Sequence, residues 1–276
     1  MTSPFDKTSV YAGSLANAAR HQRPEIRLCG ATDRLLALWI ARGPVEAILD
    51  GQVHILHAGT GVIISAGTPR QIEAMPGSFG SVISMPSGGG FAPQAPVTFA
   101  KVLNITEQTR VGGLVENVRR EETTQAEFGA AARFHLANYF LINLARLAET
   151  AKPRTPAQDL MSRFANLAER DFMKGHSLRH YAEVLDVTQA HLTETCQTLN
   201  HRSAAQFLQD RTLAEARVLL ATTQQPVEAI ADNLGFSGTD QLSRIFTERL
   251  GRSPSDYRLA FAVKPPADPI ELRAAE

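Results

Sequence analysis

Short apolar runs separated by turn residues occupy the first part of the chain. The runs at 35–40, 45–49, 52–56 and 62–64 are each long enough for one strand, and Asp50-Gly51 stands between two of them. An Asp-Gly pair between two alternating runs is a strong signal for a β-hairpin. Short strands at even spacing predict a small antiparallel β-barrel.

After about residue 112 the apolar residues recur at helical spacing. One continuous stripe at i, i+3 and i+4 intervals predicts an amphipathic helix. The segment 152–156 contains two prolines, which cannot sit in a helix interior, so we place a domain boundary there. The stripe consists of Leu136, Tyr139, Phe140, Asn143, Leu144 and Leu147.

The composition is that of an ordinary globular protein. Lys+Arg and Asp+Glu number 28 each, so the charge gives no sign of a membrane or nucleic-acid partner, and a DNA-binding interpretation must rest on geometry. No apolar stretch approaches the roughly 18 residues that span a bilayer. The start of the chain has no signal-peptide pattern, and Cys29 and Cys196 are expected to be reduced core thiols. These features predict a cytoplasmic protein without a membrane partner.

The C-terminal half contains a weak internal repeat, in residues 177–197 and 226–250. Each copy has a small residue where two helices would cross, then a turn residue able to adopt positive φ, then a hydroxyl residue able to cap the next helix. This order predicts a helix-turn-helix in each copy, with a second helix that can enter a DNA major groove. The matching pairs are Ala182 and Ala231, Asp186 and Gly235, and Thr188 and Ser237.

A long amphipathic helix is predicted between the two copies, over residues 207–221. A rigid helix in this place would hold the two reading helices one DNA turn apart, roughly 34 Å, along one face of a duplex.

Residues 156–258 resemble the DNA-binding domain of the AraC/XylS family of transcription regulators. The closing Gly-Arg-Ser-Pro followed by Tyr-Arg is the most specific part of the match. The resemblance implies a sequence-specific DNA-binding regulator, an activator with RNA polymerase as its target, and not an enzyme. The segments that carry it are 213–220 (LAEARVLL), 227–231 (VEAIA), 234–237 (LGFS), 243–246 (SRIF) and 251–258 (GRSPSDYR).

The family pattern implies which side chains read bases in double-stranded DNA. Arg244 is the best candidate, because a guanidinium can bind guanine O6 and N7 together. Glu194 and Asp240 are departures, because a carboxylate repels phosphate unless it accepts a hydrogen bond from cytosine. The implied base-reading residues are Gln189, Ala190, Thr193 and Glu194 in the first copy and Thr239, Asp240, Ser243 and Arg244 in the second.

Contacts with the DNA backbone are expected from helix starts and from scattered arginines. Residues 156–261 contain 11 Lys+Arg and 13 Asp+Glu, a net charge of 11 − 13 = −2, so non-specific affinity should be weak. Backbone N–H groups at a helix start can hold phosphate without net charge. The expected backbone-contacting residues are Thr188, Arg202, Ser203, Ser237, Arg249, Arg252 and Arg258.

The N-terminal segment resembles the cupin-like effector domain of many members of this family. Residues 58–69 match its glycine, apolar strand and turn, with Arg70 where the family pattern has a histidine. The His-x-His pair is also missing, at residues 30–33, so no metal and no cofactor are expected. A barrel interior then suits one small organic effector, such as an aromatic or other carboxylic acid. The candidate effector-binding residues are Trp39, Arg42, Arg70 and Arg27, the alternative being that Trp39 is plain core and that Arg42 and Arg70 lie on the surface.

Two interpretations of the helical stripe stay open. It docks on its own barrel, or it pairs with a second copy of the chain. The family resemblance favours a homodimer. The expected interface residues are Leu136, Tyr139, Phe140, Asn143 and Leu147.

Together the patterns predict an α+β protein of two domains, with an N-terminal cupin-like β-barrel and helical hairpin and a C-terminal all-α double helix-turn-helix domain. We expect an effector-sensing domain at 1–112, a dimerisation hairpin at 113–152, the DNA-binding domain at 153–262 and a disordered tail at 263–276. Two other functions stay open: a cupin-type enzyme with an appended helical module, and a regulator that acts mainly through protein partners.

Overall fold

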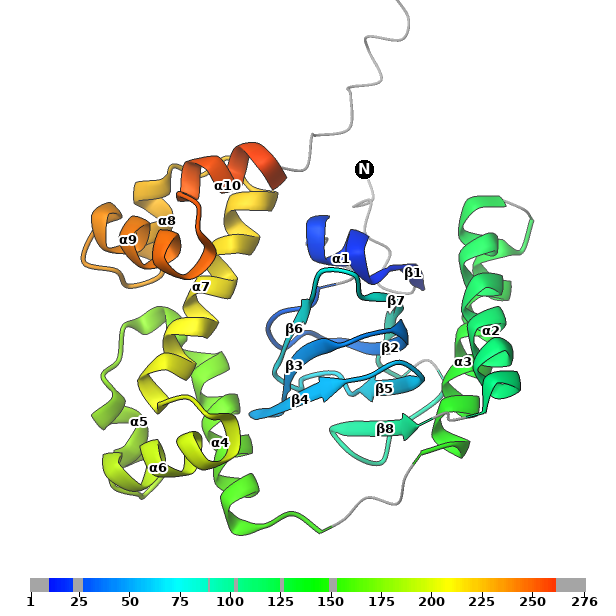
Figure 1. Ribbon diagram of the computed structural model, residues 1–276, viewed down its shortest axis with the longest axis horizontal. Coiled ribbons are helices and arrows are strands. Elements are labelled where there is room, and N and C mark those ends of the chain that lie inside the picture. The colour runs from blue at the N-terminus through cyan, green and yellow to red at the C-terminus, as the bar shows by residue number, and fades with distance from the viewer. Residues whose placement is uncertain are drawn as a thin grey trace, which may run out of the picture.

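A computed structural model describes residues 10–21, 27–88, 90–101, 104–124, 127–148 and 153–261, with the side chains of 122–124 left out. The predicted tail at 263–276 lies outside the described residues. In Figure 1 the sheets occupy the middle of the molecule, a helical hairpin covers one side, and the C-terminal helices cover the other.

The N-terminal part contains two antiparallel sheets. One has five strands in the order β1-β7-β2-β5-β8, and the other has three in the order β4-β3-β6. No hydrogen-bonded strand pair joins the two sheets within the described residues, so the predicted closed barrel is not confirmed. The strands are β1 (Tyr11–Ser14), β2 (Arg34–Arg42), β3 (Val45–Leu49), β4 (Gln52–Leu56), β5 (Thr60–Ile64), β6 (Arg70–Ala74), β7 (Phe79–Pro86) and β8 (Val97–Lys101).

Strand β2 is apolar on both faces because both faces are covered. Alternate residues of a strand point to opposite sides of its sheet. Leu36 and Leu38 join a core shared with β3 and β6, between the two sheets. Leu35 and Trp39 join a second core against the helical hairpin. This double burial explains why the run at 35–40 is continuously apolar instead of alternating.

The helical hairpin packs on the outer face of the five-stranded sheet. It consists of α2 (Ile105–Thr124) and α3 (Gly129–Arg146), and Phe140 and Leu144 of α3 are fully buried against that sheet. The inner residues of the predicted stripe therefore dock on the chain's own sheet, which was the first of the two interpretations of that stripe. A short helix, α1 (Leu15–His21), follows β1.

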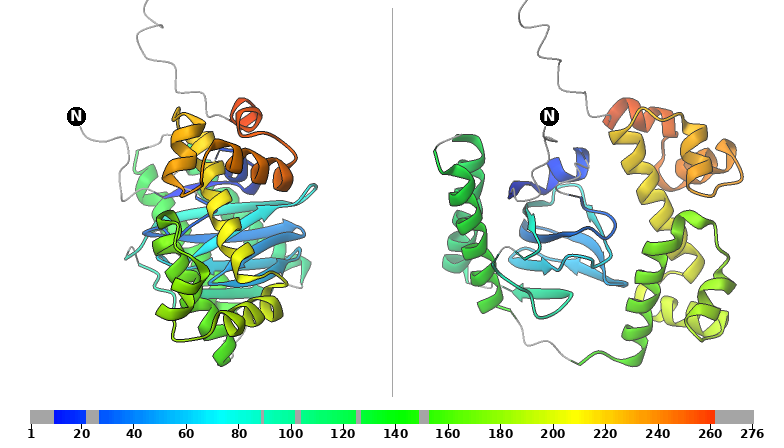
Figure 2. Two further views of the ribbon diagram at one scale, coloured as in Figure 1. Left: turned by 90° about the vertical axis from the view of Figure 1, so that its left-hand side faces the viewer. Right: turned by 180° about the vertical axis from the view of Figure 1, so that it is seen from behind.

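The C-terminal part is entirely helical in the residues described. Its central element is α7, which connects two helix-turn-helix units at its opposite ends (Figure 2). No described helix is long and apolar enough to cross a lipid bilayer. The helices are α4 (Pro156–Asp171), the short η2 (Phe172–Lys174), α5 (Leu178–Val184), α6 (Gln189–Asn200), α7 (Ala204–Thr222), α8 (Val227–Asn233), α9 (Thr239–Leu250) and α10 (Pro254–Phe261).

Candidate nucleic-acid interface

The first helix-turn-helix unit consists of α5, the turn at Asp186 and α6. Asp186 has φ 58°, as predicted for the turn residue, and Thr188 caps α6 by accepting a hydrogen bond from the backbone N–H of His191 at 3.1 Å. Leu192 and Cys196 are completely buried beneath α6. Burial of one face of α6 in this way turns the other face outward.

The outward face of α6 carries the predicted base-reading residues. Gln189, Ala190 and Glu194 are exposed, and Thr193 is half-buried. The same four residues line an open surface groove of the molecule. The geometry therefore leaves this helix free to approach a ligand as large as a duplex.

The second unit repeats this arrangement with α8, a turn at Gly235, and α9. Gly235 has φ 75°, and a Cβ added to it would lie 3.2 Å from the Cα of Gly175. A glycine is thus favoured here both by the left-handed backbone and by the close approach of another segment. Leu242 and Phe246 bury the inner face of α9.

The predicted helix cap at Ser237 is not the one observed. The residue at the cap position of α9 is Gly238, which makes no side-chain hydrogen bond. Instead Gln241 reaches back, and its Oε1 accepts hydrogen bonds from the backbone N–H of Ser237 at 2.7 Å and from its hydroxyl at 3.0 Å. The extra residue between the hydroxyl and the helix start explains the difference.

Arg244 is distinguished from every other cation of the helical domain. It is exposed on α9 together with Asp240, while Thr239 and Ser243 are half-buried. Among the described residues, Arg244 has no hydrogen bond, ion pair or aromatic contact, whereas each of the other ten Lys and Arg of 156–261 has at least one. An unpartnered guanidinium on an outward helix face is available to an external acceptor.

The four arginines predicted to hold phosphate are all engaged within the protein. Arg202 pairs with Glu46 and Asp210, and Arg249 also approaches Asp210, at 3.5 Å. Arg258 donates to the backbone oxygen of Gln225, and Arg252 lies over the ring of Phe261, 5.8 Å from its centre. The predicted contacts of these arginines with DNA phosphate would have to compete with these interactions within the protein.

The helix starts keep their predicted geometry at two of the three sites. Like Thr188, Ser203 caps its helix, accepting a hydrogen bond from the N–H of Gln206 at 3.2 Å.

The connecting helix α7 sets the distance between the two units. Its 19 residues span about 28 Å at 1.5 Å per residue. In Figures 1 and 2 the units α5–α6 and α8–α9 lie at the two ends of this helix, on the side facing away from the five-stranded sheet.

The first unit is also anchored to the three-stranded sheet. The side chain of Asn200, at the end of α6, donates to the backbone oxygen of Gly51 at 2.7 Å and accepts from the backbone N–H of Val53 at 3.0 Å. Asp50, in the same hairpin turn, accepts a hydrogen bond from Ser162 at 2.8 Å and pairs with Arg154. Nothing in the local sequence pattern marks these residues, because each contact joins positions that are more than 100 residues apart.

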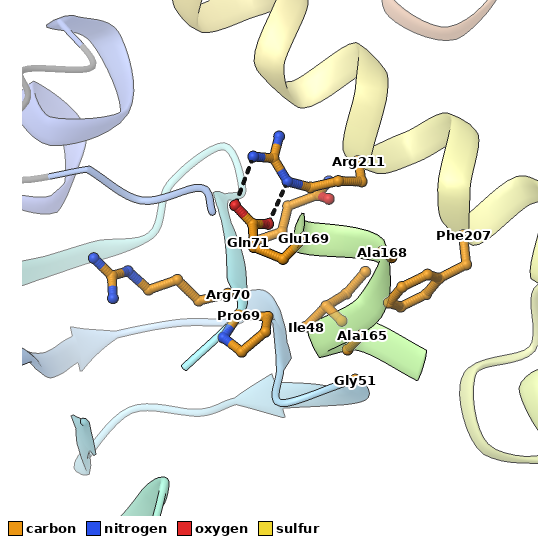
Figure 3. Close-up of a pocket in the computed structure, with 10 residues that line it drawn as sticks. All are labelled: Ile48, Gly51, Pro69, Arg70, Gln71, Ala165, Ala168, Glu169, Phe207 and Arg211. Carbon is orange, nitrogen blue, oxygen red and sulfur yellow. Dashed lines mark hydrogen bonds and ion pairs between the residues drawn. The ribbon is translucent and has the colours of Figure 1, made fainter. Parts of the chain in front are cut away.

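A buried ionic cluster forms a second link between the domains. Arg211 of α7 binds Glu169 through two hydrogen bonds, at 2.6 and 2.9 Å (Figure 3), and Glu215 at 3.0 Å. Arg27, from the N-terminal part, pairs with the same Glu215. Burial by itself lowers the pKa of Arg211, but Cys29, Glu169 and Glu215 together outweigh burial and raise it. Of these residues, only Arg27 was among the predicted site residues.

Arg70 is a buried cation without a carboxylate partner in the described residues. Its Nε donates to the backbone oxygen of Arg27 at 3.1 Å and its Nη2 to the hydroxyl of Thr32 at 2.7 Å, while its Nη1 has no partner. Burial lowers the pKa of Arg70 to about 10. Figure 3 shows the side chain pointing away from Glu169 and Arg211, on the other side of the strand. The alternative that Arg70 is a surface residue is therefore wrong.

The other predicted effector residues do not gather around Arg70. Trp39 points to the helical hairpin, on the face of β2 opposite to the core between the sheets. Arg42 is exposed and donates to the backbone oxygen of Gly77 at 2.9 Å. The cavity bordered by Arg70 has a volume of about 30 Å³, enough for one water molecule. A shared pocket for a larger ligand would need this region to open.

Two of the predicted dimer-interface residues are already buried inside the chain. Phe140 packs against the five-stranded sheet, and the buried Asn143 accepts a hydrogen bond from Arg110 at 2.6 Å. Tyr139, by contrast, is 49% exposed, and Leu136 and Leu147 are partly buried. Phe140 and Asn143 are thus unavailable to a partner, because Phe140 packs on the chain's own sheet and Asn143 is buried beside Arg110 of α2.

Comparisons with known proteins match the helical part of the chain. A family model described as a helix-turn-helix domain matches residues 181–260. The regulatory protein SoxS of Salmonella typhimurium is 35% identical over 68 residues, which is 25% of this chain and 64% of SoxS. The arabinose operon regulatory protein of Escherichia coli is 34% identical over 56 residues, or 20% of this chain and 19% of that protein. The chain thus covers less than two thirds of either relative.

Among solved structures, one of ToxT from Vibrio cholerae covers 93% of this chain and 100% of its own chain, with 9% sequence identity and a TM-score of 0.47. The C-terminal domain of AraT, a response regulator from Geobacillus stearothermophilus, covers 42% of this chain and 95% of its own, with 21% identity and a TM-score of 0.38.

Proposed function

We propose that this chain is a transcription regulator of the AraC/XylS family that binds operator DNA through α6 and α9 of its helix-turn-helix domain. The observation that carries this proposal is the state of Arg244, an exposed cation on α9 without a partner among the described residues. A bidentate contact to guanine would complete its hydrogen bonds. Gln189 and Thr193 on α6 are proposed to read the neighbouring groove.

Specific recognition has to dominate this DNA binding. The helical domain has a net charge of −2, and most of its cations are already paired within the protein. Few phosphates can therefore be neutralised, and affinity for random DNA should be low and only weakly dependent on salt. Thr188 and Ser203 each accept a hydrogen bond from one backbone N–H of α6 and α7, and the other N–H groups at these helix starts can contact phosphate without net charge.

Gel-shift measurements with the DNA upstream of the gene test this proposal. We expect Arg244→Ala to weaken operator binding by about 1–3 kcal/mol, the value of a bidentate base contact, and to relax specificity at one base pair. Arg179→Ala is the matched control, because Arg179 is also exposed but is paired with Glu183 on α5, away from the reading faces.

Failure of random DNA to enrich any motif with the full chain would contradict DNA reading. It would favour the alternative of a regulator acting through protein partners, which the carboxylates of Glu194 and Asp240 on the reading faces also favour. Nothing among the described residues favours the cupin-type enzyme over either of these.

The N-terminal domain is proposed to sense a small organic acid at Arg70. A buried guanidinium whose Nη1 lacks a partner would be satisfied by a carboxylate, and the two charges would neutralise one another away from water. The cavity that Arg70 borders lies toward Glu169 and Arg211, whereas the guanidinium points away from them, so an acid that binds the guanidinium would have to displace neighbouring segments, including the one that carries Arg27. Such a movement would reach Glu215 of α7 through the ion pair of Arg27.

A thermal-shift screen of small carboxylic acids on the full chain tests the effector site. A ligand that binds only the folded state raises Tm, and Arg70→Gln should abolish that rise for the acid that causes it. An acid that stabilises both proteins equally would place the effector elsewhere.

The proposal also includes four features that the sequence and its family resemblance imply. The chain would activate transcription with RNA polymerase as its target, in the cytoplasm, and it would act as a homodimer with Tyr139 and Leu147 at the interface.

A further inference from the structure

Three potential metal ligands lie close together at the base of the first helix-turn-helix unit. One ligand atom each of Asp171, His176 and His180 lies within 4.8 Å of the others. Asp171 ends α4, His176 follows Gly175 (φ 64°), and His180 lies in the first turn of α5. The sequence predicts no metal site, because the cupin positions lack histidines and no known ligand spacing links Asp171, His176 and His180.

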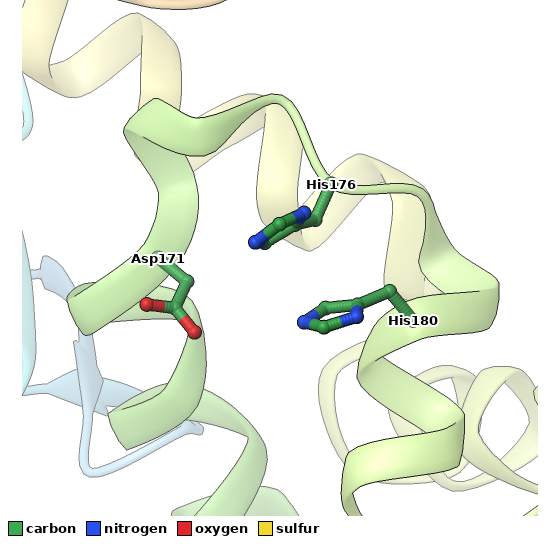
Figure 4. Close-up of side chains that lie close together, drawn as sticks. All are labelled: Asp171, His176 and His180. Carbon is green, nitrogen blue, oxygen red and sulfur yellow. The ribbon is translucent and has the colours of Figure 1, made fainter.

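The two imidazoles face the carboxylate together. Their ring centres are 4.0 Å apart with an interplanar angle of 32°, and Figure 4 shows both rings directed toward Asp171. Within the described part of the chain, neither imidazole has a hydrogen bond from its ring nitrogens. Each ring therefore keeps a lone pair that no group of the described residues uses.

Two imidazoles and one carboxylate form a ligand set that first-row divalent metals prefer. Zn²⁺ binds histidine nitrogen and aspartate oxygen at 2.0–2.2 Å, which puts tetrahedral ligand atoms about 3.3 Å apart. The present spacing of up to 4.8 Å is larger, so the side chains would have to close by rotation. His176 is exposed and His180 half-buried, and such rotation is open to both.

Two positively charged side chains beside Asp171 limit the affinity of the cluster for a metal ion. Arg170 and Lys174 hold the carboxylate of Asp171, with hydrogen bonds of 2.8 and 2.6 Å, and these bonds lower the pKa of Asp171 well below its usual range. A divalent ion would have to displace the ammonium of Lys174, which is exposed and can move into solvent. The ring of Tyr181 closes the inner side, 6.4 Å from the ring of His176.

We propose that Asp171, His176 and His180 bind one Zn²⁺ ion or a similar first-row divalent ion, with a water molecule at the fourth position. The ion would tie the end of α4 to α5, the helix that supports reading helix α6. Metal binding itself does not depend on the proposed function. Its effect on operator affinity does, so the two are measured separately.

Isothermal titration of the metal-free full chain with Zn²⁺ tests the site, with EDTA to reverse binding. We expect one ion per chain, and a loss of affinity of at least about tenfold in His176→Ala and His180→Ala. The matched controls are His191→Ala and His201→Ala, because both residues are exposed histidines of the same domain outside the cluster. Titration with Co²⁺ adds a visible absorption band whose position reports coordination by nitrogen and oxygen.

The histidine variants decide the outcome, because Asp171 is buried and its replacement disturbs the ion pairs with Arg170 and Lys174. His176→Gln and His180→Gln, checked by circular dichroism, exclude loss of folding as the cause. The proposal is overturned if the natural chain binds no Zn²⁺ at millimolar concentration, or if the two control variants lose as much affinity as the cluster variants. Gel shifts with and without Zn²⁺ then measure any effect on DNA binding.

Discussion

The two helix-turn-helix units have the same local construction but different surroundings. In both, a short helix, a positive-φ turn residue and a helix with one buried face follow one another. The core of the first unit includes Ile48 and Val53 from the three-stranded sheet, whereas the core of the second consists only of residues from the helical domain. The ion pair of Arg217 with Glu73 of β6, at 3.1 Å, is made by α7 and not by α8 or α9.

This difference shows how one duplicated module can serve two purposes. The first unit shares its core with the sensor domain, so a rearrangement of that domain would move it directly. The second unit has a core made of helical-domain residues alone, so the rearrangement would reach it only through α7. We therefore expect the first unit to be the one whose presentation to DNA an effector changes. The second unit, with the unpartnered Arg244, would supply constant base recognition.

Asn200→Ala should have the largest effect, because it breaks the docking of the first unit. The side chain is buried and serves the backbone oxygen of Gly51 and the backbone N–H of Val53, so its removal leaves both backbone groups without a partner. The expected loss is about 2–4 kcal/mol of unfolding free energy, measured by urea denaturation. Hydrogen exchange should rise in α6 and stay unchanged in α9; an equal rise in both would show that the units are not separately anchored.

Substitution of the turn residue should destabilise the second unit but not the first. Gly235→Ala puts a side chain on a left-handed backbone and 3.2 Å from Gly175, so we expect a loss of about 1–2 kcal/mol. Asp186→Gly in the first unit removes a Cβ from the same conformation and should cost nothing or slightly stabilise the fold. Thermal denaturation of the two variants, compared with the natural chain, measures the contrast.

Removal of the hydroxyls of Thr188 and Ser237 should lower stability by different amounts, because α6 and α9 are capped in different ways. Thr188→Ala deletes the hydrogen bond to the N–H of His191 and should cost about 1 kcal/mol. Ser237→Ala should cost less, because Gln241 still accepts from the backbone N–H of residue 237. Chemical denaturation can resolve the two losses, and equal losses would mean that the difference in capping has no energetic weight.

The smallest effect concerns pH and the sheet on which the first unit docks. Burial lowers the pKa of His54, on β4, whose ring packs 4.7 Å from that of Phe99. The unfolded chain then binds a proton more readily than the folded one, so stability is present above about pH 6.5 and falls as the pH drops below that value. His54→Gln should flatten this part of the stability-pH curve; an unchanged slope would assign it to other groups.

Most local features of the helix-turn-helix units follow from the sequence alone, the cap of α9 being the exception. The positive-φ residues Asp186 and Gly235 and the cap at Thr188 lie within a few residues of the helices they control, so their signals are short-range and were predicted correctly. The same holds for the outward faces of α6 and α9, which helical periodicity fixes once the apolar side is known. The apolar runs likewise marked the strands.

Tertiary structure decided the rest, because those contacts join distant parts of the chain. Asn200 and Gly51 are 149 positions apart, and no periodicity or motif links them. Whether the strands close into a barrel, which face of β2 Trp39 takes, and whether α3 covers its own sheet depend on how preformed elements pack. The ligand set of Asp171, His176 and His180 also needs the turn at Gly175 to bring two helices together. Sequence patterns determine which faces are apolar, whereas the partner that each face meets is fixed only by the fold.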